Sequence, residues 1–200
     1  MGRETDNWPY VEAKWYGKIP EGSTRRVKWI VVHDMEYPEK MTAAEEVARY
    51  FATITEVDAG KKPIKKSAHV CIDADSIVQC VKDRHIAYAA PGANSNGIQI
   101  ELAGVARQTR AQWLDEYSTK LLDKAAECIA QYCVKFDIFP RHLADAELRA
   151  GERGIIGHDQ ASRVWKESDH MDPGPNFPWD VLLEKIGPLY VARMAQTPLA

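Results

Sequence analysis

The chain has 200 residues, of which 45% are apolar and 28% charged, as in an ordinary soluble globular domain. Its net charge of −3 argues against a general nucleic-acid binder, because such proteins carry a basic excess. No apolar run approaches the roughly 20 residues that span a bilayer, and residues 1–8 hold no apolar signal core, so we expect no membrane span and synthesis in a cytoplasm without a signal peptide.

The first quarter of the chain predicts a lead-in, a strand and a helix. Residues 1–26 mix aromatic and polar residues, and we expect an irregular segment with room for one short strand. Residues 27–33 are a short β-branched run, typical of a buried strand that ends at His33. Residues 42–55 have helical spacing, since their large apolar residues recur on one face.

The middle of the chain predicts a hairpin and another strand. Residues 68–72 and 77–81 flank a polar turn of aspartate, alanine and serine, which favours a hairpin. Residues 97–102 alternate like a strand and place Glu101 near its end. Between the helix and the hairpin lies a basic loop, for which a solvated surface is the default and contact with acidic wall polymers the alternative; its lysines are Lys61, Lys62, Lys65 and Lys66.

The second half of the chain is mainly helical. Thr109 and Gln112 have capping-box spacing and predict the start of the longest helix, which reaches about residue 136. A short helix near 144–150 follows, and a terminal helix spans 179–195. This order predicts one α/β domain over residues 27–190, a sheet flanked by helices, with a tail at 191–200.

The four cysteines show no CxxC spacing. We predict that all four are buried free thiols rather than disulfides, namely Cys71, Cys80, Cys128 and Cys133.

Three residues are candidate metal ligands. His33 ends a predicted strand, His158 follows a short apolar run and a glycine, and Asp172 precedes prolines that stiffen its loop. Two histidines and one carboxylate are a common ligand set for catalytic zinc, with the fourth position open to water. Each residue alone has an ordinary interpretation, as a hydrogen-bonded histidine or a turn aspartate.

Five separated motifs occur in one order along the chain: the strand-ending His33, the segments 67–70 and 100–104, Gly157-His158, and the turn 172–175. This order resembles the zinc-dependent type 2 N-acetylmuramoyl-L-alanine amidases, relatives of the peptidoglycan recognition proteins. The resemblance covers residues 27–187 and is nearest to the amidase modules of bacteriophage endolysins, particularly those of mycobacteriophages. It implies a single α/β domain with a central mixed β-sheet flanked by helices.

The resemblance also implies roles for individual residues. His33, His158 and Asp172 match the ligands of one Zn²⁺ per chain. Glu101 matches the acidic residue that transfers protons, and His170 stands where the family places a lysine or another cationic donor. Three further residues are candidates for substrate binding: His69, which matches a hairpin histidine of the family, and the loop residues Tyr88 and Asn96.

The chain departs from the family at two places. Relatives often carry a tryptophan and a histidine on the cleft wall, where this chain has Tyr88 and Ala89. One branch uses a catalytic tyrosine directly before the hairpin histidine, and that position is Ala68 here. We therefore expect Glu101 to carry more of the proton transfer.

The implied function is hydrolysis of the linear amide between N-acetylmuramic acid and L-alanine in peptidoglycan. The expected protein is a monomeric endolysin module that is made in the host cytoplasm and acts at the bacterial cell wall after release. Two alternatives remain: a peptidoglycan-binding module without catalysis, and a cytoplasmic amidase that recycles soluble muropeptides. The complete ligand set favours an enzyme over the binding module.

Overall fold

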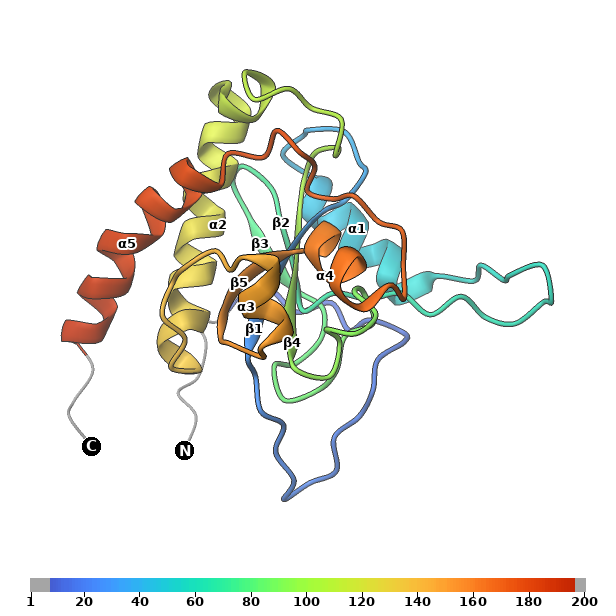
Figure 1. The fold of residues 1–200 in the computed structure, drawn as a ribbon. Coiled ribbons are helices and arrows are strands. Elements are labelled where there is room, and N and C mark those ends of the chain that lie inside the picture. Colours follow the sequence, from blue (N-terminus) through green and yellow to red (C-terminus); the bar gives the residue numbers. More distant parts are fainter. Residues whose placement is uncertain (1–7, 197–200) are drawn as a thin grey trace.

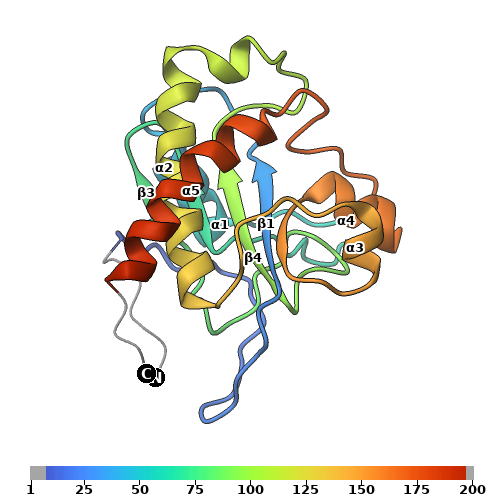
Figure 2. The same ribbon diagram turned by 60° about the vertical axis from the view of Figure 1, so that its left-hand side comes forward.

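Five strands form one mixed β-sheet in the computed structural model, which describes residues 8–196 (Figures 1 and 2). The order of the strands across the sheet is β3-β2-β4-β1-β5. All neighbouring pairs are parallel except β2 and β3, which form the predicted hairpin. The strands are β1 (Trp29–Asp34), β2 (Val70–Ile72), β3 (Ile77–Gln79), β4 (Gly97–Leu102) and β5 (Gly154–Gly157).

Helices cover both faces of the sheet. The helices are α1 (Ala43–Thr53), η1 (Gln112–Leu114), α2 (Glu116–Lys135), α3 (Asp145–Arg149), α4 (His158–Trp165) and α5 (Trp179–Ala195). Helix α2 lies against one face and α5 packs on α2 (Figure 2). Helix α1 covers β2 and β3 on the other face, and α3 and α4 cover β1 and β5 there.

The alternation of side chains along β1 explains this division. Ile30 and Val32 point into the core under α2, while Trp29 and Val31 belong to the cluster under α3 and α4. His33 therefore shares the face of Val31 and lines a cleft that residues of α1 and α4 also line. Parallel strands buried on both faces read as continuous apolar runs, as residues 29–32 do.

The predicted α/β architecture is confirmed, and so are the strand 97–102 and the terminal helix 179–195. Helix α5 thus runs through the first residues of the predicted tail, and residues 197–200 lie outside the described residues. All four cysteines are free and buried, as expected. Among the described residues, no helix has the length and apolarity that a membrane crossing requires.

The structure corrects two features of the predicted elements. The lead-in forms no strand between residues 8 and 26, only single bridges at Tyr10 and Gly17, and residues 1–7 lie outside the described residues. The long helix does not begin at Thr109. The side chain of Gln112 does accept a hydrogen bond from the Thr109 N–H at 2.9 Å, but this turn is followed by a break, and Asp115 caps α2 by accepting from Ser118 N.

Candidate metal centre and active site

The candidate ligands meet at the carboxyl ends of the parallel strands. His33 is the penultimate residue of β1, and His158 is the first residue of α4, directly after β5. Asp172 lies in the loop between α4 and α5. Because β1 and β5 are parallel neighbours, their ends bring His33 and His158 together although 125 positions separate them.

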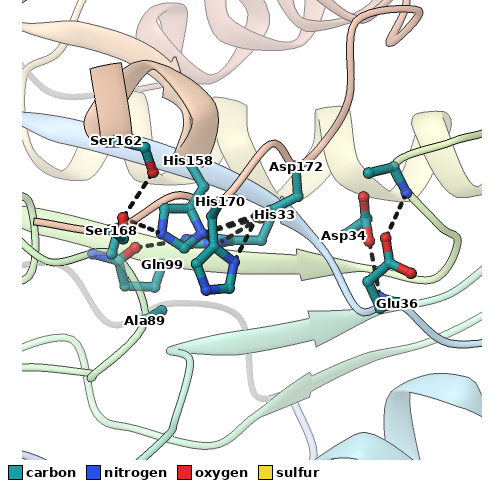
Figure 3. A network of polar contacts seen from close by, with 12 residues as sticks. His33, Asp34, Glu36, Ala89, Gln99, His158, Ser162, Ser168, His170 and Asp172 are labelled. Atoms are coloured by element: carbon teal, nitrogen blue, oxygen red, sulfur yellow. Dashed lines mark hydrogen bonds and ion pairs between the residues drawn. The ribbon is translucent and has the colours of Figure 1, made fainter. Parts of the chain in front are cut away.

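Three donor atoms converge from these residues (Figure 3). His33 Nδ1 lies 3.1 Å from His158 Nδ1 and 3.0 Å from Asp172 Oδ2, and His158 Nδ1 lies 3.2 Å from the same oxygen. The side chains are almost fully buried, with 2%, 2% and 6% of the residue exposed for His33, His158 and Asp172. The structure thus brings the three predicted ligands to one point.

The far nitrogen of each imidazole is held by another side chain. His33 Nε2 donates to Gln99 Oε1 at 2.8 Å. His158 Nε2 lies 3.4 Å from Ser168 Oγ, which in turn is 2.7 Å from Ser162 Oγ. These contacts leave both Nδ1 atoms directed toward Asp172.

This donor set fits a zinc ion. Atoms bound tetrahedrally to Zn²⁺ at about 2.0–2.2 Å lie about 3.3 Å from one another, and the three observed separations fall between 3.0 and 3.2 Å. Imidazole nitrogen and carboxylate oxygen are ligand types that zinc accepts, and hydrogen-bonded far nitrogens are typical of metal-binding histidines. His33, His158 and Asp172 would hold the ion.

Without an ion, the site is a cluster of coupled charges. Burial lowers the pKa of His33, but the hydrogen bond to Asp172 and the nearby Glu101 outweigh burial and raise it to about 9. Burial alone would raise the pKa of Asp172, yet hydrogen bonds from three histidines hold it well below its usual range. The cluster therefore contains a proton that a cation can replace.

Glu101 stands beside the ligands on β4, in register with His33 on β1. Burial raises the pKa of its carboxyl group to about 7, and the neighbouring His33 only partly opposes this shift. Within residues 8–196 the carboxylate has no hydrogen-bond or ion-pair partner, and it lines the cleft above the ligands. Such a carboxylate is suited to accept a proton from water near neutral pH.

His170 forms part of the same cluster at its solvent side. Its ring stacks on His158 with centroids 4.2 Å apart, and its Nδ1 lies 3.2 Å from Asp172 Oδ1. The hydrogen bond with Asp172 raises the pKa of His170, and its side chain is 59% exposed. An imidazole whose protonated form is favoured by Asp172 is thus held at the mouth of the site.

The ligands open into a cleft of about 1100 Å³. Its lining includes residues of α1 and the following loop, among them Tyr50, Phe51 and Lys66, and also Tyr88. Of the three candidate substrate-binding residues, only Tyr88 lines this cleft.

The other two candidates for substrate binding lie elsewhere. His69 is 0% exposed, and its Nδ1 accepts a hydrogen bond from the backbone N–H of Gln99 at 2.9 Å. Asn96 donates from Nδ2 to the carbonyl of Arg26 and so joins two loops. Both residues connect parts of the backbone, and neither lines the cleft.

Sequence reasoning missed Gln99 and Ser168, which hold the far nitrogens of the two ligands. The signal for Gln99 was available, since it is the one amide in an apolar strand and shares a face with Glu101 two positions later. Asp34 and Asp159, which directly follow the ligands, orient no imidazole. Asp34 Oδ1 accepts from Glu36 N, and the carboxylate of Asp159 pairs with Arg163.

One glycine makes the loop of Asp172 possible. Gly174 has φ +97°, and a Cβ atom there would lie 2.0 Å from the carbonyl oxygen of Ala106. Only glycine permits this backbone approach, which seats the loop against residues that follow β4.

Comparison with known proteins finds one matching family and no matching curated sequence. Residues 23–175 match the family described as N-acetylmuramoyl-L-alanine amidase. No curated protein matches the chain in sequence.

Three solved structures illustrate the similarity of fold. The hydrolase AmiA of Staphylococcus aureus, solved with its ligand, is 16% identical, with a TM-score of 0.68 over 98% of this chain and 89% of that one. The N-acetylmuramoyl-L-alanine amidase LysC from Clostridium intestinale is 16% identical, with a TM-score of 0.54 over 91% and 98%. A mutant endolysin from Bacillus subtilis is 17% identical, with a TM-score of 0.53 over 90% and 99%.

Proposed function

This chain belongs to the N-acetylmuramoyl-L-alanine amidase family, and we propose that it is a zinc-dependent enzyme that hydrolyses the amide between N-acetylmuramic acid and L-alanine in peptidoglycan. The observation that carries the proposal is the convergence of three buried donor atoms, from His33, His158 and Asp172, beside an unpaired carboxylate. A wall-binding module without catalysis would not require this arrangement.

The residues divide the chemistry between them. Bound zinc would supply a Lewis acid and lower the pKa of water toward ~7. Glu101 takes the proton from the attacking water and returns it to the leaving amine of L-alanine, which completes the proton balance of hydrolysis. Burial raises the pKa of its carboxyl group, which suits it to both steps.

His170 acts on the carbonyl oxygen of the scissile amide. Its hydrogen bond to Asp172 favours the protonated imidazole, whose other N–H can donate to the oxygen as negative charge develops. The stack on His158 fixes the plane of the ring. With Ala68 and Ala89 at positions where relatives carry other polar groups, Glu101 and His170 are the polar groups proposed for these steps.

The cleft favours an extended polymeric substrate. Its volume of about 1100 Å³ exceeds what a single dipeptide fills, and its rim carries aromatic side chains, among them Tyr37, Tyr50 and Tyr88. We therefore propose lysis of intact wall, as in an endolysin, with recycling of soluble muropeptides as the second candidate. The fold of the Bacillus subtilis endolysin supports the first, at 17% identity.

One experiment tests the proposal in two steps. The purified chain should contain about one zinc per molecule by mass spectrometry, and purified peptidoglycan should release peptides with a new amino-terminal L-alanine. Removal of the metal with a chelator should stop the release, and added Zn²⁺ should restore it. Comparing intact wall with soluble muropeptides then separates the two candidates. A metal-free chain that binds wall without releasing peptides would show a binding module instead.

A further inference from the structure

Gln99 is a buried amide in the centre of the sheet. It lies in β4, where Glu101 is the only other polar side chain, and 0% of it is exposed. Burying an amide in an apolar environment costs free energy unless its polar atoms find partners. The contacts of Gln99 therefore call for a specific explanation.

The oxygen of Gln99 faces a metal ligand. Gln99 Oε1 lies 2.8 Å from His33 Nε2 (Figure 3), and an amide oxygen can only accept a hydrogen bond. His33 Nε2 must then carry the proton. An imidazole that binds a metal is neutral and has one N–H, so in that form this contact leaves Nδ1 with a free lone pair, directed toward His158 and Asp172.

The amide nitrogen of Gln99 makes no comparable contact. Gln99 Nε2 is buried and has no hydrogen-bond partner in the described part of the chain. Gly97 makes room for it, since a Cβ atom on Gly97 would lie 2.8 Å from this nitrogen. The backbone of Gln99 is fixed on both sides by His69, whose Nδ1 accepts from Gln99 N and whose N–H donates to Gln99 O, each at 2.9 Å.

We propose that Gln99 is a positioning residue that sets the tautomer and ring orientation of His33, so that Nδ1 is presented to the metal. This inference rests on the proposed metal-dependent function. It explains why an amide is buried here, because its oxygen contacts His33 although its nitrogen has no partner in the described part of the chain. It also gives His69 a role, which is to hold the strand that carries Gln99.

Titration of the metal-free protein with Co²⁺ tests the inference, because the visible spectrum of bound cobalt reports ligand geometry. Gln99→Leu should weaken cobalt and zinc binding by about 10- to 100-fold, the usual effect of losing such a contact. Gln99→Glu keeps an acceptor at the same place and should retain metal binding. Gln79→Leu is the matched control, because Gln79 is a strand glutamine whose amide donates to Asp83 away from the metal.

The outcomes separate this inference from the proposed function. If the unmodified chain binds no metal, the proposed function fails. If it binds metal and Gln99→Leu binds equally well with the same cobalt spectrum, the positioning role is wrong. If Gln79→Leu and Gln99→Leu weaken binding equally, the effect is general destabilisation and the inference is also wrong.

A second feature is a basic ridge, which we define as Lys61, Lys62 and Lys65 on the loop between α1 and β2. Figure 1 shows this loop extending away from the body of the protein. Its tip is held by Asp58, whose Oδ1 accepts from the N–H groups of Gly60 and Lys62, each at 2.9 Å. The ridge is therefore a structured projection.

Among the described residues the ridge lysines form no ion pair, and Lys65 Nζ lies over the ring of Trp15, 5.5 Å from its centroid. Lys61, Lys62 and Lys65 have no carboxylate partner within residues 8–196, whereas the acidic groups of the same loop are already engaged. Glu56 pairs with Lys66 at 3.3 Å, and the Asp58 carboxylate accepts backbone N–H groups. Three cations that no carboxylate of the described residues neutralises, on a chain of net charge −3, form a local positive surface.

The ridge continues the wall of the cleft, because Glu56 and Lys66 at its base line that cleft. We infer that the basic ridge binds carboxylates of stem peptides that neighbour the one being cleaved, so that the polymer is held along the cleft. This inference also rests on the proposed function, which places peptidoglycan in the cleft.

Cosedimentation with insoluble walls tests the ridge, with zinc-loaded chain carrying Glu101→Gln so that the wall stays intact. Neutralising the ridge as Lys61→Gln, Lys62→Gln and Lys65→Gln should weaken binding about five- to tenfold at low salt, and by less at high salt. The matched control removes the same charge elsewhere, as Lys28→Gln, Lys82→Gln and Lys166→Gln, and should bind like the parent.

Chemical treatment of the wall identifies the anion. Amidation of the wall carboxylates should abolish the difference between ridge variant and parent, whereas hydrofluoric acid, which strips phosphodiester-linked polymers, should leave it. Loss of the difference after acid treatment would assign the ridge to phosphodiesters and overturn the inference, as would equal binding of ridge variant and parent.

Discussion

His33 and Glu101 lie directly opposite each other in the parallel pair of β1 and β4, so that a proposed metal ligand and an unpaired carboxylate share one face of the sheet. Their separation is set by the spacing of neighbouring strands, about 4.8 Å, and not by a flexible loop. The backbone ladder of the sheet therefore fixes the proposed proton acceptor with respect to the proposed metal site.

This relationship predicts that Glu101 affects catalysis and not metal binding. Glu101→Gln should lower kcat for peptide release from the wall by about 10²- to 10⁴-fold, because the proton acceptor is lost, while zinc content stays near one per chain. Asp172→Asn is the comparison, since it removes a ligand and should lose both zinc and activity. Full activity of the Glu101→Gln enzyme would remove Glu101 from the mechanism.

The raised pKa of Glu101 predicts the acid limb of the pH profile. Because the base form is required, activity should rise with pH and level off above the pKa, which is about 7 without metal. The charge of a bound cation lowers this pKa, so the midpoint should lie between 4.5 and 7. The remaining activity of Glu101→Gln, measured as initial rates of peptide release, should not show this rise with pH. An unchanged limb would assign it to another group.

Metal-free protein should become less stable as pH rises from 7 to 9. The folded pKa values of His33, Asp34 and Glu101 are raised to about 9, 8 and 7, so the folded state binds more protons than the unfolded state in this range. The contribution of His33 is complete below its ordinary pKa of 6.5 and is lost as pH rises through 9, and the carboxyl groups act in the same direction.

Thermal unfolding followed by circular dichroism in chelator measures this effect as a decrease in Tm. The double variant Asp34→Asn and Glu101→Gln should show a smaller decrease, because only His33 of these three groups then titrates. Zinc-loaded protein should show no such loss, since metal binding strengthens as its ligands are deprotonated. A rise in Tm between pH 7 and 9 in chelator would contradict the proposed charge state of the site.

His170 should be replaceable by lysine but not by alanine. His170→Ala removes the donor to the developing oxyanion and should lower kcat by about 10²-fold with little change in KM. His170→Lys restores a cationic donor and should recover most of that loss. Zinc content should stay unchanged in both, because three other residues supply the ligands. Equal activity of the alanine variant and the parent would leave His170 as a surface residue.

Gly174→Ala should disturb the site through the backbone. The new Cβ would lie 2.0 Å from Ala106 O at a φ of +97°, which should cost at least about 2 kcal/mol and lower Tm by about 4–8 °C. The displaced loop carries Asp172, so zinc affinity should fall as well.

Gly22→Ala is the control for this variant. Gly22 also has a positive φ, +80°, but no atom lies within 4 Å of a Cβ built there. It therefore measures the cost of the backbone conformation alone, about 1 kcal/mol, and should leave zinc affinity unchanged. A similar Tm for the two variants would show that the loop moves away from Ala106 without cost.

The boundaries of the elements show where sequence reasoning fails. Gly154–Gly157 reads as a short apolar run, but only its pairing with β1 makes it a strand. Helix α4 begins at His158 with few apolar residues, and the tertiary fold supports it, as the buried Gln160 accepts from Gly157 N. Local propensity was too weak to predict either element.

The sequence by itself determined the α/β order of the elements, and its residue types and motif order predicted the three candidate ligands and Glu101 without coordinates. Only the tertiary structure decided that His69 and Asn96 serve the framework and that Gln99 holds His33. A parallel sheet brings residues together across more than a hundred positions. Which side chains then share a face depends on strand register, and no local pattern encodes that register.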